Sequence, residues 1–533
     1  RSSDLVTLRI GEIDGMNQSV ATATEEQTSV VESINMDITE INTLNQEGAA
    51  AYAFSPRHQL AQMAVTGCLS QTFYASGQDQ LEQLGNLVLE VDTRFTAQTA
   101  VYARQRGYMK DMPATLAAAL AVWDTALLNQ VFGRVIDNGK MLRNFVQIVR
   151  SGAMGRKSLG SAPKKLVQNW LLNASEKQLL SACVGKQPSL ADVVKMVHPK
   201  PQEAWRSAWF AWLIGKPFDE AELPPITQAF ERFKRDAAQG LVSAELPDVP
   251  FQMLTALELK AQQWAQIARS GSWQMVRQNL NTFARHGVFE IKGMAALVAH
   301  KLGDADAVAK ARAMPYQLLS AYQAAGEQVP AQVRDALQDA MEHAIANVPC
   351  FAGAVVVCPD VSGSMHSPVT GYRTGATTAV RCIDVAGLMA AAVLRKNRTA
   401  RVLPFEQKVV KLELNGRDSV ITNASKLAKI GGGGTNCSAP LKQLADEKAR
   451  VDMVIMVSDN ESWVDGVRRG ATETMLQWGR IKQRNPDARL VCIDIQPYGT
   501  TQAMERDDIL NVGGFSDAVF DLIAQYAAEA EDG

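Results

Sequence analysis

Residues 352–365 read AGAVVVCPDVSGSM, an apolar run that ends in one carboxylate and two hydroxyls. A near-continuous apolar run of this length is typical of a strand that is buried on both faces of a parallel sheet. In a loop that leaves such a strand, side chains at positions i, i+2 and i+4 can converge, so Asp360, Ser362 and Ser364 can present three oxygens to one ion. Ligation by oxygen alone favours Mg²⁺, with Mn²⁺ or Ca²⁺ as alternatives, over zinc.

Two later segments of the chain offer further oxygens to the same ion. The glycine-rich segment IGGGGTN at 430–436 contains Thr435, and MVIMVSDNES at 453–462 contains Asp459 after a second buried run. Because the carboxyl ends of parallel strands lie at one edge of a sheet, we expect these side chains to meet Asp360 there. The sequence therefore predicts one divalent metal site with two carboxylates and three hydroxyls.

The order of these five residues resembles the metal-ion-dependent adhesion site of von Willebrand factor A domains, which has D-x-S-x-S, a distant Thr and a distant Asp. The resemblance implies that the ion keeps an open position, which water or an acidic group of a protein ligand completes. A second interpretation is that Asp360 and the serines only cap a following helix, because Asp and Ser are good N-cap residues. The strand, the glycine-rich loop and the second strand-end Asp together favour the metal site.

The chain has 533 residues, so we expect more than one domain. Region 350–533 alternates buried strand-like runs with helical patterns and predicts a doubly wound α/β domain. Region 49–349 is rich in Ala, Leu and Gln, and its apolar residues recur every three or four positions without strand-like alternation. Prolines interrupt this pattern at places that suit turns between helices. The region therefore predicts an α-solenoid of HEAT-like helical pairs.

Residues 1–48 differ in character from the rest of the chain. Apolar residues with heptad spacing run from Met16 to Leu44, which is typical of a coiled-coil or bundle helix. The string SVATATEEQTSVVESINMDITEIN at 19–42 resembles the methylated signalling helix of bacterial chemoreceptors. A working receptor needs a long antiparallel hairpin and a membrane anchor, so we expect a fusion remnant or an oligomerisation segment instead.

The composition is that of an ordinary soluble globular protein, with 47% hydrophobic and 21% charged residues. No apolar stretch reaches the roughly 18 residues of a membrane span, and no secretory signal is visible, so we expect a cytoplasmic protein without membrane contact. The seven cysteines are scattered without a C-x-x-C pair, which predicts reduced thiols and neither a disulfide framework nor a zinc site.

The net charge of −2 hides an uneven distribution of charge along the chain. Segment 138–175 contains no Asp or Glu but has seven Lys and Arg residues. A solvated helix face normally interleaves both signs, whereas a block of one sign suits a polyanion. The block therefore favours nucleic acid as a partner, and the mildly acidic total predicts binding through local patches that weakens steeply with salt.

Three tryptophans, Trp205, Trp209 and Trp212, recur at the spacing of one helix face. They could stack on bases of a nucleic acid. Large aromatic residues at this spacing are more often the buried stripe of a solenoid helix, so we expect core packing.

The combination of a helical module with an A-type domain resembles the Ro autoantigen family, whose members contain the TROVE module. The resemblance covers about 49–533, and the A-domain strings CPDVSGSMHSP, GGGGTNCSAP and VSDNES are specific for it. The helical module contributes TRFTAQTAVYARQRGYMKDMP at 93–113, NFVQIVRSGAMGRKSLGSAPKKLVQNWL at 144–171, ADVVKMVHPKP at 191–201 and KARAMPYQLLSAYQA at 310–324.

This resemblance implies a monomeric ring in which helical repeats close with the help of the A domain. Members of the family bind small Y RNA on a basic outer surface and the single-stranded 3′ ends of misfolded RNA in a basic central hole. An exoribonuclease such as polynucleotide phosphorylase is a further partner that the resemblance suggests.

The residues that match the basic strings of the family are the predicted RNA contacts: Arg143, Arg150, Arg156, Lys157, Lys164, Lys165, Lys195, His198 and Lys200. His198 ranks below the arginines, because a single His beside a Pro is often only a helix-end residue. A second group could equally form salt bridges between helices: Arg104, Arg106, Lys110, Arg285 and Arg312.

The sequence thus predicts an RNA-binding protein that acts in RNA stability or quality control. We expect no catalytic activity, because metal-dependent nucleases cluster several acidic ligands around two ions and no Ser-His-Asp or Cys-His set stands out. The alternative is a metal-dependent adaptor that binds an acidic protein ligand without RNA. A chelatase-like accessory subunit is disfavoured, since the chain has no ATPase motif.

Overall fold

The structure is a computed structural model. It describes the residues 43–45, 47–66, 76–239, 241, 246–311, 313–369, 380–459, 461–462, 472–504, 506–514 and 518–528. The chemoreceptor-like segment 1–48 lies outside the described residues except for its last few positions, and so does the candidate Arg312.

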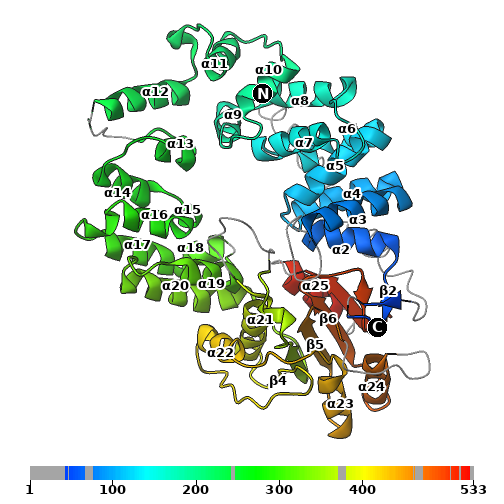
Figure 1. The fold of residues 1–533 in the computed structure, drawn as a ribbon. Coiled ribbons are helices and arrows are strands. Elements are labelled where there is room, and N and C mark those ends of the chain that lie inside the picture. Colours follow the sequence, from blue (N-terminus) through cyan, green and yellow to red (C-terminus); the bar gives the residue numbers. More distant parts are fainter. Residues whose placement is uncertain are drawn as a thin grey trace, which may run out of the picture.

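The first half of the helical module runs up one side of the molecule (Figure 1). Its helices are α2 (Pro56–Thr66), α3 (Gly77–Glu90), α4 (Thr93–Gln105), α5 (Asp111–Trp123), α6 (Thr125–Val135), α7 (Gly139–Ser151), α8 (Ser161–Asn173), α9 (Glu176–Ala182), α10 (Leu190–Val197) and α11 (Ala204–Ile214). Most of them begin at a side chain that accepts a hydrogen bond from the first turn: Ser76, Asp92, Asp124, Asn138, Ser175 and Ser189.

These helices pack in two layers around one core. Helix α4 contacts α5 and α6, while α5 contacts α7 and α6 contacts α8. Residues 112–121 of α5 are all buried, and five of them are alanines, whose small side chains let the neighbouring helices approach closely. The predicted solenoid of helical pairs is confirmed for this half.

The second half descends on the other side of the ring. It contains α12 (Pro225–Ala238), α13 (Phe251–Thr255), α14 (Ala261–Ser270), α15 (Trp273–Gln278), α16 (Leu280–Arg285), α17 (Met294–Gly303), α18 (Ala305–Lys310), α19 (Pro315–Ala324) and α20 (Ala331–Ala344). Three short 3₁₀ turns join them: η1 (Glu220–Glu222), η2 (Val288–Glu290) and η3 (Ile345–Asn347). The apolar side chains of this half form a second core, which continues into the α/β domain.

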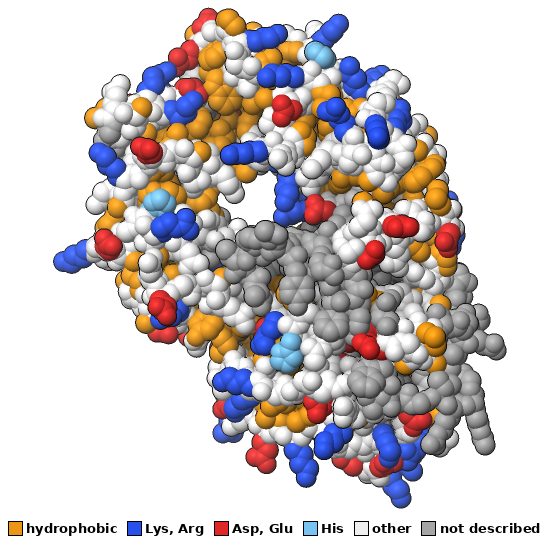
Figure 2. All heavy atoms as spheres, in the orientation of Figure 1, with side chains coloured by type: hydrophobic (Ala, Val, Ile, Leu, Met, Phe, Trp, Pro, Cys, Tyr) orange, Lys and Arg blue, Asp and Glu red, His pale blue; other side chains and the backbone are white. Residues whose placement is uncertain are grey.

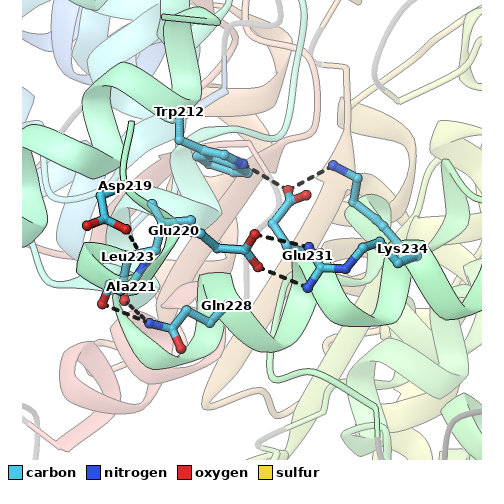
Figure 3. A network of polar contacts seen from close by, with 9 residues as sticks. Trp212, Asp219, Glu220, Ala221, Leu223, Gln228, Glu231 and Lys234 are labelled. Atoms are coloured by element: carbon cyan, nitrogen blue, oxygen red, sulfur yellow. Dashed lines mark hydrogen bonds and ion pairs between the residues drawn. The ribbon is translucent and has the colours of Figure 1, made fainter. Parts of the chain in front are cut away.

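A polar network connects the two halves of the helical module at the junction between α11 and α12 (Figure 3). Glu220 accepts hydrogen bonds of 3.2 and 2.9 Å from the guanidinium of Arg235. Glu231 accepts one bond of 2.8 Å from the indole of Trp212 and another of 2.8 Å from Lys234. Trp212 also packs against both cores, so this junction is fixed by apolar and polar contacts together.

The α/β domain contains a five-stranded parallel sheet in the order β4-β3-β5-β6-β8. Its strands are β3 (Val355–Pro359), β4 (Arg401–Val402), β5 (Met453–Ser458), β6 (Arg489–Asp494) and β8 (Ile509–Gly513). The helices are η4 (Ser364–His366), α21 (Cys382–Lys396), α22 (Val420–Leu427), α23 (Ser438–Asp446), α24 (Glu473–Lys482) and α25 (Ala518–Ala528).

Alternate residues of the strands face opposite layers of helices. Val357 and Ile455 join the core under α21, α22 and α25, whereas Val356 and Val454 join the core under α23 and α24. Burial on both faces explains why the strands read as continuous apolar runs. The predicted fold class, a helical solenoid with a doubly wound α/β domain, is confirmed.

The α/β domain closes the helical arc into a ring. The short strand β2 (Ala50–Ala53) pairs with β1 (Thr43–Leu44) and with β7 (Thr500–Thr501), and helix α2 packs so closely on β8 that a Cβ at Gly513 would lie 2.6 Å from the Gln62 side chain. Residues 50–53 were expected to begin the helical module, and that expectation is corrected, because these residues extend the β structure of the other domain. At the opposite end, the Glu342 carboxylate accepts a bond of 2.7 Å from the backbone N–H of Val420.

The closed ring leaves an opening through the molecule, and Lys and Arg side chains lie at its rim (Figure 2). Across the described ranges, none of the helices has the length and the hydropathy that a membrane span requires.

Candidate metal centre and nucleic-acid interface

Asp360 and Asp459 lie side by side at the carboxyl edge of the sheet. Asp360 follows β3 directly and Asp459 follows β5, and the backbone N–H of Asp360 donates a bond of 2.9 Å to the carbonyl of Val457. Both side chains are buried, with at most 3% of their surface exposed. The parallel pairing of the two strands therefore brings the predicted carboxylates together.

The two serines of the motif lie on the loop that follows β3. The backbone N–H of Ser362 donates a bond of 2.8 Å to Oδ1 of Asp360, and Oγ of Ser362 lies 3.4 Å from Oγ of Ser364. No long helix follows at this point, because the loop enters only the single turn η4, whose N-cap Gly363 makes no side-chain bond. The interpretation of these residues as helix caps is therefore wrong.

The glycine-rich segment packs directly on this loop. The N–H of Gly432 donates to the carbonyl of Val361, and the N–H of Gly363 donates to the carbonyl of Gly433, both at 2.9 Å. Gly431 has a φ of +88°, and a Cβ there would lie 1.9 Å from the Val361 carbonyl oxygen, so only glycine fits. The segment delivers Thr435, which is buried and lies next to the loops that carry the two aspartates and the two serines.

The electrostatics of the site suit a cation. Burial raises the pKa of Asp360 to about 7, and the neighbouring Asp459 contributes to the rise. Burial also raises the pKa of Asp459. Two buried carboxylates repel each other unless a proton or a positive ion lies between them, and oxygen ligands select a hard divalent cation. The residues present therefore fit the divalent ion that the motif predicts.

The sequence prediction missed three polar residues at the same edge. Ser458 bonds to Asp360, Glu461 is buried, and Asp494 ends β6 with its carboxylate buried. Burial and the nearby Glu461 raise the pKa of Asp494 well above its usual value. The strand-end rule that found Asp459 would also have found Asp494. Among the described residues, no three acidic, His or Cys side chains cluster as metal ligands.

The predicted RNA contacts lie on α7, α8, α10 and the loops between them. Six of the nine are exposed on the surface: Arg150, Lys157, Lys165, Lys195, His198 and Lys200. Lys164 is half-buried in the first turn of α8. In Figure 2, Lys and Arg side chains gather over the upper right of the ring, where Figure 1 places α6 and α8.

Arg143 requires a correction, because its side chain is buried in the core of the ring. One guanidinium nitrogen donates a bond of 3.2 Å to the carbonyl of Pro188, and another donates to the carbonyl of Val184. The guanidinium also packs against Gly185, where a Cβ would lie only 2.2 Å from it, so no side chain fits at this position. Arg143 therefore positions the loop between α9 and α10 and does not face a ligand.

Arg156 also has a structural partner. Its Nη1 donates a bond of 3.0 Å to the carbonyl of Ala121, near the carboxyl end of α5, where a positive charge complements the helix dipole. The guanidinium packs over Gly160, which has a φ of +69° and no room for a side chain. Arg156 thus ties the loop 152–160 to α5 and leaves Lys157 on the surface.

His198 terminates α10 in the left-handed conformation, with a φ of +51°. Its neighbour Val197 accepts a bond of 2.6 Å from Nε2 of Gln168, so the end of α10 is fixed to α8. This link holds the end of α10, which carries Lys195 and is followed by Lys200, against the basic helix α8.

Comparisons with known proteins concern the whole chain and its α/β domain. Residues 354–527 match the family model described as the Ro60 vWA domain. The chain is 25% identical to the RNA-binding protein RO60 of Deinococcus radiodurans over 520 residues, which are 91% of this chain and 94% of that protein. The resemblance to the Ro family is confirmed. The Ro-like chain is also 23% identical to the RNA-binding protein RO60 of Caenorhabditis elegans over 240 residues, 43% of this chain and 36% of that one.

A solved structure has the same Ro fold. The crystal structure of the Deinococcus radiodurans RO (RSR) protein superimposes with a TM-score of 0.63 at 20% identity, over 89% of this chain and all of that one. A separate match of 45 residues, at 87% identity, links the Ro-like chain to the chemotaxis protein McpG of Pseudomonas putida. That match covers 8% of this chain and 7% of McpG.

Two of the remaining aromatic and basic candidates, Trp209 and Arg104, have structural partners. Trp209 is fully buried and its indole donates a bond of 3.1 Å to Thr227, so the core-packing interpretation of the stripe is confirmed. Arg104 forms an ion pair of 2.9 Å with Asp137. Burial and the nearby Lys140 lower the pKa of Lys110.

Proposed function

We propose that this chain is an RNA-binding protein of the Ro type. The observation that carries the proposal is the exposed basic residues of α7, α8 and α10, of which α7 and α8 lie within a segment of 38 residues without Asp or Glu. Lysines and arginines on such a surface bind phosphates and release counterions. The names of its relatives in Deinococcus and Caenorhabditis support the same assignment.

The first turn of α8 adds a feature that suits phosphate. It contains Lys164 but no acidic residue, Lys165 follows directly, and the N-cap Gly160 makes no side-chain bond to the free N–H groups. Lysines oppose the helix dipole at this end unless an anion is present, whereas a phosphate interacts favourably with both the lysines and the N–H groups.

We further propose the class of RNA. The basic outer surface would bind a small structured RNA of the Y type, and the opening of the ring, with Lys and Arg at its rim, would hold the single-stranded 3′ end of misfolded RNA (Figure 2). The role would be RNA stability or quality control in the cytoplasm, with an exoribonuclease as a candidate partner. No catalytic step is proposed for this chain.

The proposed cofactor is a divalent cation, with Mg²⁺ ahead of Mn²⁺ and Ca²⁺. It would be held by the buried carboxylates and hydroxyls at the sheet edge: Asp360, Ser362, Ser364, Thr435 and Asp459. When bound, the ion supplies a positive charge to which water or an acidic group of a protein ligand can bind.

The proposal is tested with a charge-reversal variant, R150E/K164E/K165E, in a fluorescence anisotropy titration with a hairpin RNA that has a single-stranded 3′ extension. We expect affinity to fall by a factor of about 100 or more, because each lost phosphate contact also becomes a repulsion. The matched control is K408E/K411E/R450E, which makes the same change of charge at exposed positions of the α/β domain. Equal affinity of the first variant and the parent would contradict RNA binding here and favour the adaptor.

A further inference from the structure

Trp123 is unlike the other described tryptophans. It is the last residue of α5, and 41% of its surface is exposed, whereas the others are buried or half-buried. Its neighbour Val122 packs against the core of the ring, but Trp123 does not belong to that core. Within the described part of the chain, its indole has no hydrogen-bond partner and no ring or cation contact. An exposed indole is a common anchor for a binding partner.

The carboxyl end of α5, which carries Trp123, contacts the loop 152–160. Arg156 of this loop donates a hydrogen bond of 3.0 Å to the carbonyl of Ala121, which lies two residues before Trp123 in α5. The loop follows Arg150 at the end of α7 and leads into Lys164 at the start of α8. The end of α5 that carries Trp123 is therefore held against the loop that connects the basic helices α7 and α8.

The acidic residue next to the indole is already engaged by the protein. Asp124 accepts a bond of 2.9 Å from the N–H of Leu127 at the start of α6, and one of 3.1 Å from the hydroxyl of Thr93. Its carboxylate is thus directed to the helix end and to α4. This arrangement reduces the repulsion that a phosphate would meet near Trp123.

We propose that Trp123 stacks on an unpaired base of the RNA whose phosphates bind the neighbouring lysines and arginines. An aromatic side chain beside cations is the usual arrangement for single-stranded nucleic acid, because the base covers the ring while the backbone contacts the charges. Bases inside a duplex are already stacked on one another and cannot reach such a ring. Trp123 therefore makes this surface prefer RNA with an unpaired nucleotide over a plain duplex. The inference rests on the proposed function.

The test compares W123A and W123F with the parent on two labelled RNAs, a hairpin with a single-stranded 3′ extension and the same sequence fully paired. W123A is expected to bind the extended hairpin about 10-fold more weakly, the loss typical of one stacked base. W123F keeps a ring and is expected to retain most of the affinity. The control is F218A, which removes a ring with the same exposed fraction of 41% at a distant loop.

A second measurement reports stacking directly. A 2-aminopurine placed in the 3′ extension should lose fluorescence when the parent binds, and should lose less of it with W123A. If W123A binds both RNAs like the parent, or loses the same factor on both, the stacking proposal is wrong. Unchanged binding of both RNAs would favour a protein ligand at this position, whereas an equal loss on both would indicate a contact that does not depend on an unpaired base.

The charge-reversal variant separates the two proposals. When R150E/K164E/K165E loses affinity and W123A does not, only the stacking role of Trp123 fails. When neither variant loses affinity, the basic surface itself does not bind RNA and the proposed function fails with it.

Discussion

Ser458, the last residue of β5, donates a hydrogen bond of 2.6 Å from its Oγ to Oδ2 of Asp360, which follows β3. The other carboxylate oxygen of Asp360 accepts the N–H of Ser362 at 2.8 Å. Both oxygens are thus oriented by the sheet and by the loop before any ion binds. Fixed ligands of this kind lower the cost of ordering the site when a cation enters.

The isosteric variant D360N should lose divalent cation binding. The amide keeps the shape of the side chain but removes the charge that a hard cation needs, and Asp459 alone is a poor site. Titration calorimetry with Mg²⁺ measures the loss, and equal heats of binding in D360N and the parent would refute the site. RNA affinity should stay within about a factor of 2, because the basic surface lies on the helical module and the expected contacts are local.

The stability of the metal-free protein should depend on pH through the same residue. The pKa of Asp360 is raised to about 7 by burial and by Asp459, so the folded protein binds this proton more tightly than the unfolded chain does. The resulting stability is fully present below the ordinary carboxyl pKa and is lost as the pH rises through about 7.

In the presence of a chelator, the melting temperature of the parent should therefore be higher at about pH 6 than at about pH 8. Other titrating groups also contribute to this difference, so it is compared with that of a control variant. D360N is that control, because it lacks the titrating group, and the difference between the two proteins isolates Asp360. Excess Mg²⁺ should reduce the difference, since the ion replaces the proton. An identical pH profile for D360N and the parent would contradict the prediction.

The sequence predicted that Asp360 and Asp459 lie at one sheet edge because strand ends obey a simple rule. Apolar runs at 352–359 and 453–457 predict central strands, and parallel strands place their following residues at one edge. The pattern of charged residues was less informative about the proposed RNA-binding surface, because a sequence does not show whether a charged side chain is buried. Arg143 counts as a cation in the sequence, yet the register of α7 points it at backbone carbonyls. Strand β2 was missed because its pairing partner β7 lies more than 440 residues away.

The salt dependence of RNA binding should change with the lysines of α8. Each phosphate contact contributes about 0.7 to 0.9 to the slope of log affinity against log salt, so K164A/K165A should reduce the slope by about 1.5. The matched pair K408A/K411A on the α/β domain should leave it unchanged. Anisotropy titrations at several salt concentrations give the slopes. A full slope in K164A/K165A would mean that these lysines do not contact phosphate.

Arg143 and Arg150 lie on the same helix, and their substitution should have opposite consequences. R143M leaves the buried carbonyls of Val184 and Pro188 without donors, so the free energy of unfolding should fall by about 2 to 3 kcal/mol, while RNA affinity per folded molecule is retained. R150M removes an exposed charge, so RNA affinity should fall about 3- to 10-fold without loss of stability. Urea unfolding and RNA titration of both variants check this. A stable R143M with weakened RNA binding would restore Arg143 as a direct contact, because a purely structural arginine cannot give that result.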